Sequence, residues 1–148
     1  MKTKKDISYG VIPIHQEAGE WKVFLINQLS RIGDNAYWIF PKGHPENNED
    51  PLDTAVRELR EETNLMAESF VSEPTFTLQY DFVFDGVRIE KTVVFYIGVI
   101  ENPAYELDVT EVQEAGWYSL AEAAERLDYQ DTKHMFVEAR KFIESYKE

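Results

Sequence analysis

The chain has 148 residues, a length that suits one domain built around a single core. Hydrophobic residues make up 43% and aromatic residues 14%, which excludes an intrinsically disordered chain. The formal net charge of -13 argues against nucleic-acid binding through a basic surface, and the lack of cysteine excludes disulfides, thiolate nucleophiles and thiolate zinc sites.

The chain carries no pattern of a membrane or secreted protein. The longest apolar stretch, TVVFYIGVI, is far shorter than the roughly 20 residues that a spanning helix needs. The basic segment MKTKKD precedes a short apolar run without a cleavage-site pattern, which is not typical of a signal peptide. We therefore expect one soluble, cytoplasmic domain over residues 1–148, with no membrane partner.

Strand signals dominate the N-terminal part of the chain. Residues 6–16 and 20–29 are rich in β-branched and aromatic residues and are separated by a short turn, which predicts a hairpin. Residues 30–36 are predicted to form a loop, and residues 37–40 a short strand. The polar stretch 42–51 shows no periodicity and is predicted to be a second loop.

Residues 51–63 change to a helical period. Asp50 is placed to cap the N-terminus, Pro51 suits the first helical position, and Asn64 can adopt the left-handed conformation that closes a helix. Apolar residues recur at the spacing of one helical face: Leu52, Ala55, Val56 and Leu59. This stripe is predicted to pack on the core.

Further strand signals follow this helix. Residues 76–84 and 90–100 flank the segment DGVRI, whose Asp-Gly pair is a turn signal. Residues 101–114 are predicted to form an acidic loop, and residues 116–120 a short strand.

Two helices are predicted at the C-terminal end. Ser119 can cap a helix over residues 120–127, and residues 132–147 form an amphipathic closing helix. The apolar side of the closing helix carries Met135, Phe136, Ala139, Phe142 and Ile143. Mixed strands with helices between and after them predict an α/β fold in which helices cover both faces of a sheet.

Three carboxylates gather on the predicted central helix. At about 100° per residue, Glu58, Glu61 and Glu62 fall within roughly one third of the helix circumference, away from the apolar stripe. Such a run is commonly a solvated face, and Arg57 and Arg60 can offset its charge. The alternative is a metal site, because Mg²⁺ prefers oxygen ligands and needs only a few carboxylates when substrate phosphate completes its shell.

The segment before this helix offers groups that bind anions, whereas the carboxylates of the helix bind cations. Gly43 permits a tight turn and close approach of a ligand to the backbone, while Lys42 and His44 supply donors suited to phosphate. An anion-binding loop beside a cation-binding helix predicts a site for a metal-bridged phosphate. The net charge of -13 agrees, because an anionic substrate would otherwise be repelled.

Residues 43–65 resemble the Nudix box, which reads Gly, five residues, Glu, seven residues, Arg-Glu, an aliphatic residue, one residue, Glu-Glu, one residue, Gly and an aliphatic residue. The chain departs from it at Asn64, in place of the final glycine, and Asn is a mild replacement where a helix closes. The matching residues are Gly43, Glu49, Arg57, Glu58, Leu59, Glu61, Glu62 and Leu65.

The resemblance to the Nudix hydrolases implies an α/β/α sandwich with a mixed central sheet. It also implies an enzyme that uses Mg²⁺ or Mn²⁺ to hydrolyse a nucleoside diphosphate linked to another moiety. By the same resemblance, Glu58, Glu61 and Glu62 hold the metal, Glu58 is the favoured residue to activate water, and the Lys42 carbonyl adds a ligand.

The resemblance implies roles for further charged residues. Arg57 orients the glutamates through salt bridges, and Glu49 supports them. A downstream acidic loop commonly adds a ligand or base in this family, and here Glu111 is the first choice and Glu114 the alternate. The competing interpretation is that both lie in a solvated loop.

Outside the box, the chain resembles the diadenosine tetraphosphate hydrolases. The segment WIFPKGHPE is similar to the one that leads into their box, and Tyr80 lies near the place of a tyrosine in these enzymes. The segment EKTVVFY is similar to their lysine-containing strand, which implies that Lys91 binds phosphate.

Adenine presents a flat π surface on which an aromatic side chain can stack. Tyr80, Tyr129 and Phe136 are the candidates, and core packing is the alternative for each. The segment DFVFDGVRIE is longer than in the resembled subgroup, so an extended hairpin is expected to reshape the base pocket.

Three functions stay open at this point. The first is asymmetric hydrolysis of diadenosine tetraphosphate or a related dinucleoside polyphosphate to nucleoside mono- and triphosphate. The second is the same chemistry on a nucleoside triphosphate, a nucleotide sugar or an RNA 5′ end, although the acidic charge disfavours long RNA. The third is a nucleotide-binding domain without catalysis, against which the complete glutamate set argues.

Overall fold

The computed structural model describes residues 1–30 and 35–147, so residues 31–34 of the predicted loop 30–36 lie outside the described residues. The described part of the chain folds into one mixed sheet with three helices. Its strands are β1 Lys2–Glu17, β2 Glu20–Leu29, β3 Ala36–Ile39, β4 Lys42–Gly43, β5 Ser69–Phe70, β6 Phe76–Phe84, β7 Val87–Val99 and β8 Val112–Ser119. Its helices are α1 Pro51–Thr63, α2 Leu120–Arg126 and α3 Gln130–Ser145.

The centre of the sheet is a long parallel pair. β1 and β7 run in one register from the Lys2–Val87 pair to the Ile14–Val99 pair. The sheet has the order β3-β2-β1-β7-β5, with β4 on β1, β6 on β7 and β8 on β2, and these other pairs are antiparallel. The predicted mixed sheet is confirmed.

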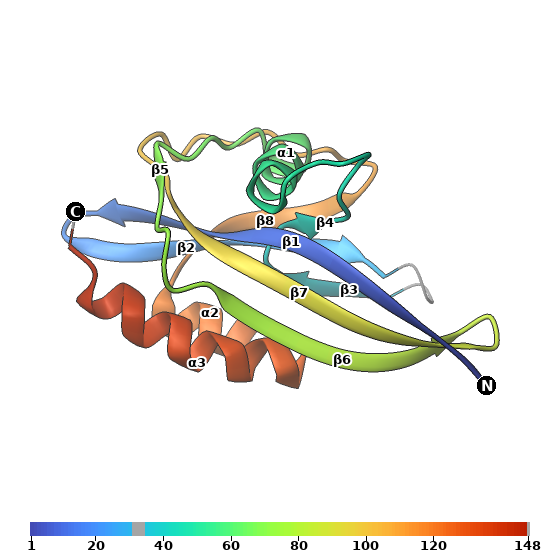
Figure 1. Cartoon of the computed structure of the whole chain (residues 1–148). Coiled ribbons are helices and arrows are strands. Elements are labelled where there is room, and N and C mark those ends of the chain that lie inside the picture. Colours follow the sequence, from blue (N-terminus) through green and yellow to red (C-terminus); the bar gives the residue numbers. More distant parts are fainter. Residues whose placement is uncertain (31–34, 148) are drawn as a thin grey trace.

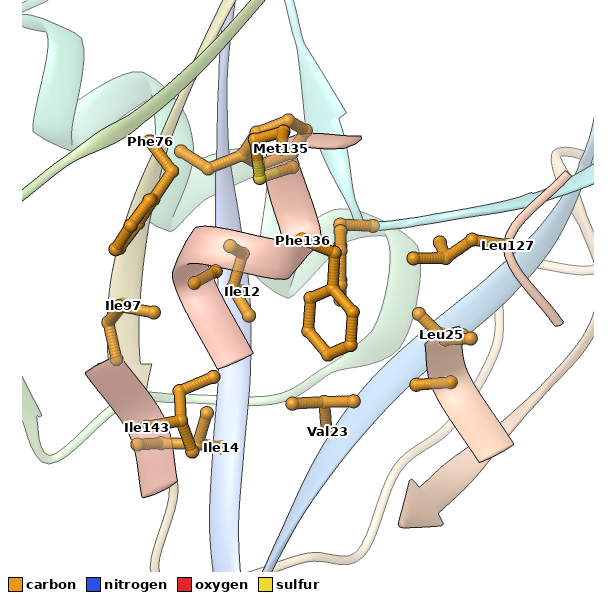
Figure 2. Packing of buried hydrophobic residues seen from close by; sticks show 14 of the residues in the cluster. Ile12, Ile14, Val23, Leu25, Phe76, Ile97, Leu127, Met135, Phe136 and Ile143 are labelled. Atoms are coloured by element: carbon orange, nitrogen blue, oxygen red, sulfur yellow. The ribbon is translucent and has the colours of Figure 1, made fainter. Parts of the chain in front are cut away.

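Helices cover both faces of this sheet, with α1 on one side and α2 and α3 on the other (Figure 1). Each layer has its own apolar cluster. The cluster beneath α2 and α3 is shown in Figure 2 and includes Ile12, Val23, Leu25, Ile97, Phe136 and Ile143. The predicted α/β/α sandwich is therefore correct. Among the described residues, no helix combines the length and apolar character that crossing a bilayer requires.

Both predicted hairpins form. The β6–β7 turn places Asp85 at φ 52° and Gly86 at φ 73°, the left-handed pair that a tight two-residue turn requires. The strands extend beyond their predicted limits, since β7 begins at Val87 and β8 begins at Val112. Pairing with β1 and β2 recruits residues whose local sequence signal is weak.

Other element limits also differ from the sequence prediction. The polar segment predicted as a loop over residues 42–51 contributes β4, because Lys42 pairs with Gly10. The predicted strand 116–120 gives its last residue to α2, and α3 begins at Gln130 rather than at residue 132. Ser119 caps α2 as predicted, in a capping box with Glu122.

The limits of α1 agree with the prediction, but its buried face does not. Asn64 closes the helix at φ 61°, and its amide donates to the Arg60 carbonyl. The predicted apolar stripe is wrong at two positions, because the side chains of Leu52 and Val56 are exposed. The helix packs through smaller and polar residues instead: Thr54, Ala55, Leu59, Glu62 and Thr63. The buried face of α1 is therefore rotated relative to the predicted stripe, and it includes the carboxylate of Glu62.

Candidate active site

The first feature of the site is a contact between β4 and α1. A Cβ atom at Gly43 would overlap the carboxyl group of Glu58, so a larger residue there would have to displace that side chain. The close approach that the sequence predicted for a ligand is made by Glu58. β4 is held in place by its pairing with β1, which opposes Gly43 to Tyr9.

Arg57 joins the loop before α1 to the glutamates on the helix. Its Nε and Nη2 atoms donate to both carboxylate oxygens of Glu49, at 2.9 and 3.0 Å. Its Nη1 atom donates to Glu58 at 3.0 Å and to Glu61 at 3.2 Å, and Nη2 also donates to the His44 carbonyl at 2.8 Å. One guanidinium thus orients three carboxylates, the arrangement that the resemblance implies for Arg57.

Glu49 supports this arrangement as an ionised group. It accepts hydrogen bonds from the Glu46 amide and the Thr54 hydroxyl as well as from Arg57. The Arg57 hydrogen bonds are the main cause that lowers the pKa of Glu49 to about 2. Glu49 therefore keeps its charge across the neutral range and anchors Arg57 from the side opposite Glu58 and Glu61.

Glu62 is the unusual member of the carboxylate group. Its side chain is buried, and among the described residues its Oε2 atom has no hydrogen-bond partner. Burial, and then the negative charge of Glu58, raise the pKa of Glu62 to about 9. Burial also raises the pKa of Glu58, against the effect of Arg57. A buried, unpartnered acceptor beside a second carboxylate is a place where a cation would remove a large electrostatic cost.

The remaining predicted metal ligands differ in position. Glu61 is half-exposed and paired with Arg57. Glu111 lies close enough to Glu62 to raise its pKa, because the loop before β8 docks on the end of α1 through the Asp108 amide and the Glu62 carbonyl, at 3.2 Å. Glu114 lies on β8, and both glutamates are exposed, so the effect of Glu111 on Glu62 is the observation that favours Glu111.

These groups form an oxygen-rich set that fits Mg²⁺ or Mn²⁺ in its donor chemistry. Within residues 1–30 and 35–147, no three acidic, histidine or cysteine side chains already converge as a complete metal cage. In this arrangement the Glu61 carboxylate is bound to Arg57 at 3.2 Å. The unpartnered oxygen of Glu62 remains the observation that fits a cation.

A second cluster, of hydrogen-bonded polar and charged side chains, adjoins the first through His44. The His44 ring lies 2.9 Å from Asp6 and 3.1 Å from the Lys91 ammonium, while its carbonyl accepts from Arg57. Lys91 is buried and also bonds Asp6 at 2.8 Å and Ser8 at 2.5 Å. Burial favours a higher pKa for Asp6, but the hydrogen bonds with His44 and Lys91 outweigh burial and lower that pKa.

Two members of this cluster, Asp6 and Ser8, were missed from the sequence. The parallel register pairs Asp6 with Lys91 and Ser8 with Val93, although these partners are far apart in the chain. A phosphate at Lys91 would therefore meet an ammonium group that is already oriented by Asp6. Lys42 contributes positive charge that lowers the pKa of Glu62.

The aromatic candidates separate into surface and core. Tyr80 is half-buried and opposes Lys91 across the β6–β7 pair. Tyr129 is exposed at the start of α3 and packs on Tyr37 with ring centroids 4.7 Å apart. Tyr37 was not predicted as a site residue. Phe136 was wrongly considered for base stacking, because it is buried in the core beneath α3.

Comparison with known proteins shows which family and which solved structures this chain is similar to. A model of the NUDIX domain matches residues 4–139. The asymmetrical bis(5′-nucleosyl)-tetraphosphatase of Mus musculus is 28% identical over 108 residues, which are 72% of each chain. The C. elegans Ap4A hydrolase binary complex has a TM-score of 0.81 at 24% identity, over 95% of this chain and 99% of that chain.

A third relative is longer than this chain. A Mycobacterium tuberculosis (strain CDC 1551 / Oshkosh) protein, described as a candidate mutator protein MutT4, is 33% identical over 120 residues. That match covers 81% of this chain and 47% of the relative, so the chain spans about half of its length.

The matched domain, the α/β/α fold and the box residues define the class: the chain belongs to the NUDIX family. Within the family it is similar to the Ap4A hydrolases, as the sequence motifs predicted. These similarities support a pyrophosphohydrolase.

Proposed function

We propose that this chain hydrolyses a phosphoric anhydride bond in diadenosine tetraphosphate or a related dinucleoside polyphosphate, giving a nucleoside monophosphate and a nucleoside triphosphate. The observation that carries the proposal is the buried, unpartnered Oε2 atom of Glu62 beside Glu58. Arg57 bonds both Glu58 and the His44 carbonyl, and the His44 ring lies beside Lys91. Because Lys91 opposes Tyr80, these contacts support neighbouring cation, phosphate and base sites.

The proposed metal ligands are Glu58, Glu61, Glu62 and Glu111, with the Lys42 carbonyl. When bound, Mg²⁺ or Mn²⁺ supplies neutralisation of phosphate charge and a lower pKa for water. Arg57 holds Glu58 and Glu61 through ion pairs at 3.0 and 3.2 Å. Glu61 would join the ligand set only if its carboxylate gave up part of its contact with Arg57.

In the proposed reaction Glu58 accepts a proton from the attacking water, and Glu111 is the alternative base. Gly43 keeps the Glu58 carboxylate against β4, where a larger residue would displace it. Lys91 and His44 bind the oxygens of the polyphosphate. Tyr80 and Tyr129 bind a nucleobase; Tyr129 is exposed at the start of α3.

The test is a substrate panel. The protein is incubated with Mg²⁺ or Mn²⁺ and with diadenosine tetraphosphate, a nucleoside triphosphate, ADP-ribose or capped RNA, and products are separated by chromatography. The expected products from diadenosine tetraphosphate are AMP and ATP. Two molecules of ADP would contradict the asymmetric cleavage, and no turnover of any substrate with either metal would overturn the enzymatic proposal.

A further inference from the structure

One end of the sheet extends beyond the helices. The N-terminal part of β1, the start of β7 and the end of β6 form a three-stranded ribbon, with the N-terminus and the β6–β7 turn together at its tip (Figure 1). The two registers share β7, so they align residues in rows across all three strands. Lys2, Val87 and Phe84 form one row, and Lys4, Ile89 and Phe82 form the next.

Residues opposed in a row point to the same face of the sheet, and alternate rows share that face. The third row of this face is Asp6, Lys91 and Tyr80, which belongs to the proposed phosphate and base site. The face therefore continues without a break from that site to the tip of the ribbon. We name its outer part the ribbon strip, which consists of Lys2, Lys4, Phe82, Phe84, Val87 and Ile89.

The ribbon strip combines exposed aromatic surface with positive charge in a chain of net charge -13. Phe84 is 54% exposed, Phe82 is half-buried, and both lysines are exposed. The opposite face carries charges of both signs, because Lys5 lines the same hollow of about 430 Å³ as Asp81 and Glu90. The ribbon strip carries two lysines and no carboxylate, which favours phosphate along it.

The aromatic rings at alternate positions of β6 share a face with the lysines of β1, which lie across the intervening strand β7, and the two rows together suit a nucleobase and its phosphate. The Tyr80 and Phe82 rings lie 6.0 Å apart with planes 30° from each other, so the aromatic surface of the site continues towards the tip. Base stacking on such rings is tolerant of base identity, and lysines add charge without fixing a direction.

We propose that the ribbon strip binds the second nucleoside of a dinucleoside polyphosphate, with its base on Phe84 or Phe82 and its nearest phosphate beside Lys4 or Lys2. This inference rests on the proposed function and deepens it, because it makes the extended hairpin a selectivity element for dinucleotides over mononucleotides. The segment that is longer than in the resembled subgroup would then supply the second base site.

The experiment compares diadenosine tetraphosphate with adenosine 5′-tetraphosphate, which has the same phosphates but one nucleoside. In Phe84→Ala we expect the ratio of the two kcat/KM values, dinucleotide over mononucleotide, to fall at least about 5-fold, the range for one lost base stack. Val83→Ala is the matched control, because Val83 is 56% exposed on the opposite face of the same strand. Its ratio should equal that of the unmodified chain.

Three outcomes decide the matter. A ratio that is unchanged in Phe84→Ala, or that falls equally in Val83→Ala, overturns the ribbon strip as a second base site. Thermal melting of both variants identifies a loss caused by unfolding, and Lys4→Gln provides a second variant that removes no apolar packing. If the unmodified chain turns over neither nucleotide, the proposed function fails. In that case calorimetry measures the affinity of the same variants for a non-hydrolysable dinucleoside tetraphosphate, and an unchanged affinity in Phe84→Ala overturns the ribbon strip as a second base site.

Discussion

The main chain of Gly43 lies directly against the carboxylate of Glu58, and no side chain fits between them. A glycine that is usually explained by backbone flexibility is here required by the volume of a neighbouring carboxyl group. The strand β4 and the helix α1 are thereby fixed relative to each other at the position where the proposed base acts.

Gly43→Ala should therefore reduce turnover without unfolding the chain. The added methyl group must displace Glu58 or shift β4, and we expect kcat to fall by about 10²-fold, because small misplacements of catalytic groups have effects of this size. Steady-state kinetics measures the loss, and thermal melting measures the fold. In the double variant with Glu58→Gln, the two losses in kcat should not multiply, since both act on one group. Full multiplication of the two losses would show that Gly43→Ala does not act through Glu58.

Glu58→Gln should lower kcat at least about 10²-fold, the usual effect of losing a general base or ligand, while the melting temperature stays near that of the unmodified chain. Glu111→Gln tests the alternative base. Glu114→Gln is the control, because Glu114 is exposed like Glu111 but lies on β8 rather than in the loop that docks on α1, and it should keep nearly full activity. A larger loss in Glu111→Gln than in Glu58→Gln would transfer the role of base to Glu111.

Without metal, the stability of the chain should fall as pH rises from about 5 to 9. The folded state keeps the proton of Glu62 to a pKa of about 9, whereas the ordinary pKa of a glutamate carboxyl is 4.5. Between these values the folded state binds more protons than the unfolded state, so the free energy of unfolding decreases with pH. Melting temperatures in a chelator measure this trend.

The Glu62→Gln variant isolates the contribution of Glu62, since an amide does not titrate. Its melting temperature should depend less on pH than that of the unmodified chain, and Mg²⁺ should stabilise the unmodified chain more at pH 8 than at pH 6. Identical pH profiles for the two proteins would show that Glu62 does not control this trend.

Tyr80→Ala should raise KM more than it lowers kcat if the ring only stacks on a base. Loss of one stack corresponds to roughly 1–3 kcal/mol, which is about a 5- to 150-fold change in affinity. An unchanged KM in Tyr80→Ala would leave Tyr80 with a packing role.

Local chemistry made much of this structure predictable. Pro51 and Asn64 mark the ends of α1, Asp85 and Gly86 mark the hairpin turn, and the order of strands and helices indicates the sandwich. At the ends of α1 and at the hairpin turn, the signal comes from a backbone conformation that few residues adopt well.

The burial of Glu62 could not be predicted in this way. Hydrophobic periodicity assigned the buried face of α1 to Leu52 and Val56, but the helix packs through Thr54 and Thr63, whose small side chains allow close contact. The Thr63 hydroxyl donates to the Leu59 carbonyl, so it is satisfied within the helix, and its polarity carries no cost in the core.

The parallel pairing of β1 and β7 has a consequence for the order in which the site is assembled. Apart from Glu111, the carboxylate half lies between Gly43 and Glu62, so most of it comes from one short stretch of chain. The phosphate half requires Asp6 to meet Lys91 across 85 residues. Since long-range contacts close slowly during folding, a nascent chain can hold its metal-binding helix well before it can hold a nucleotide.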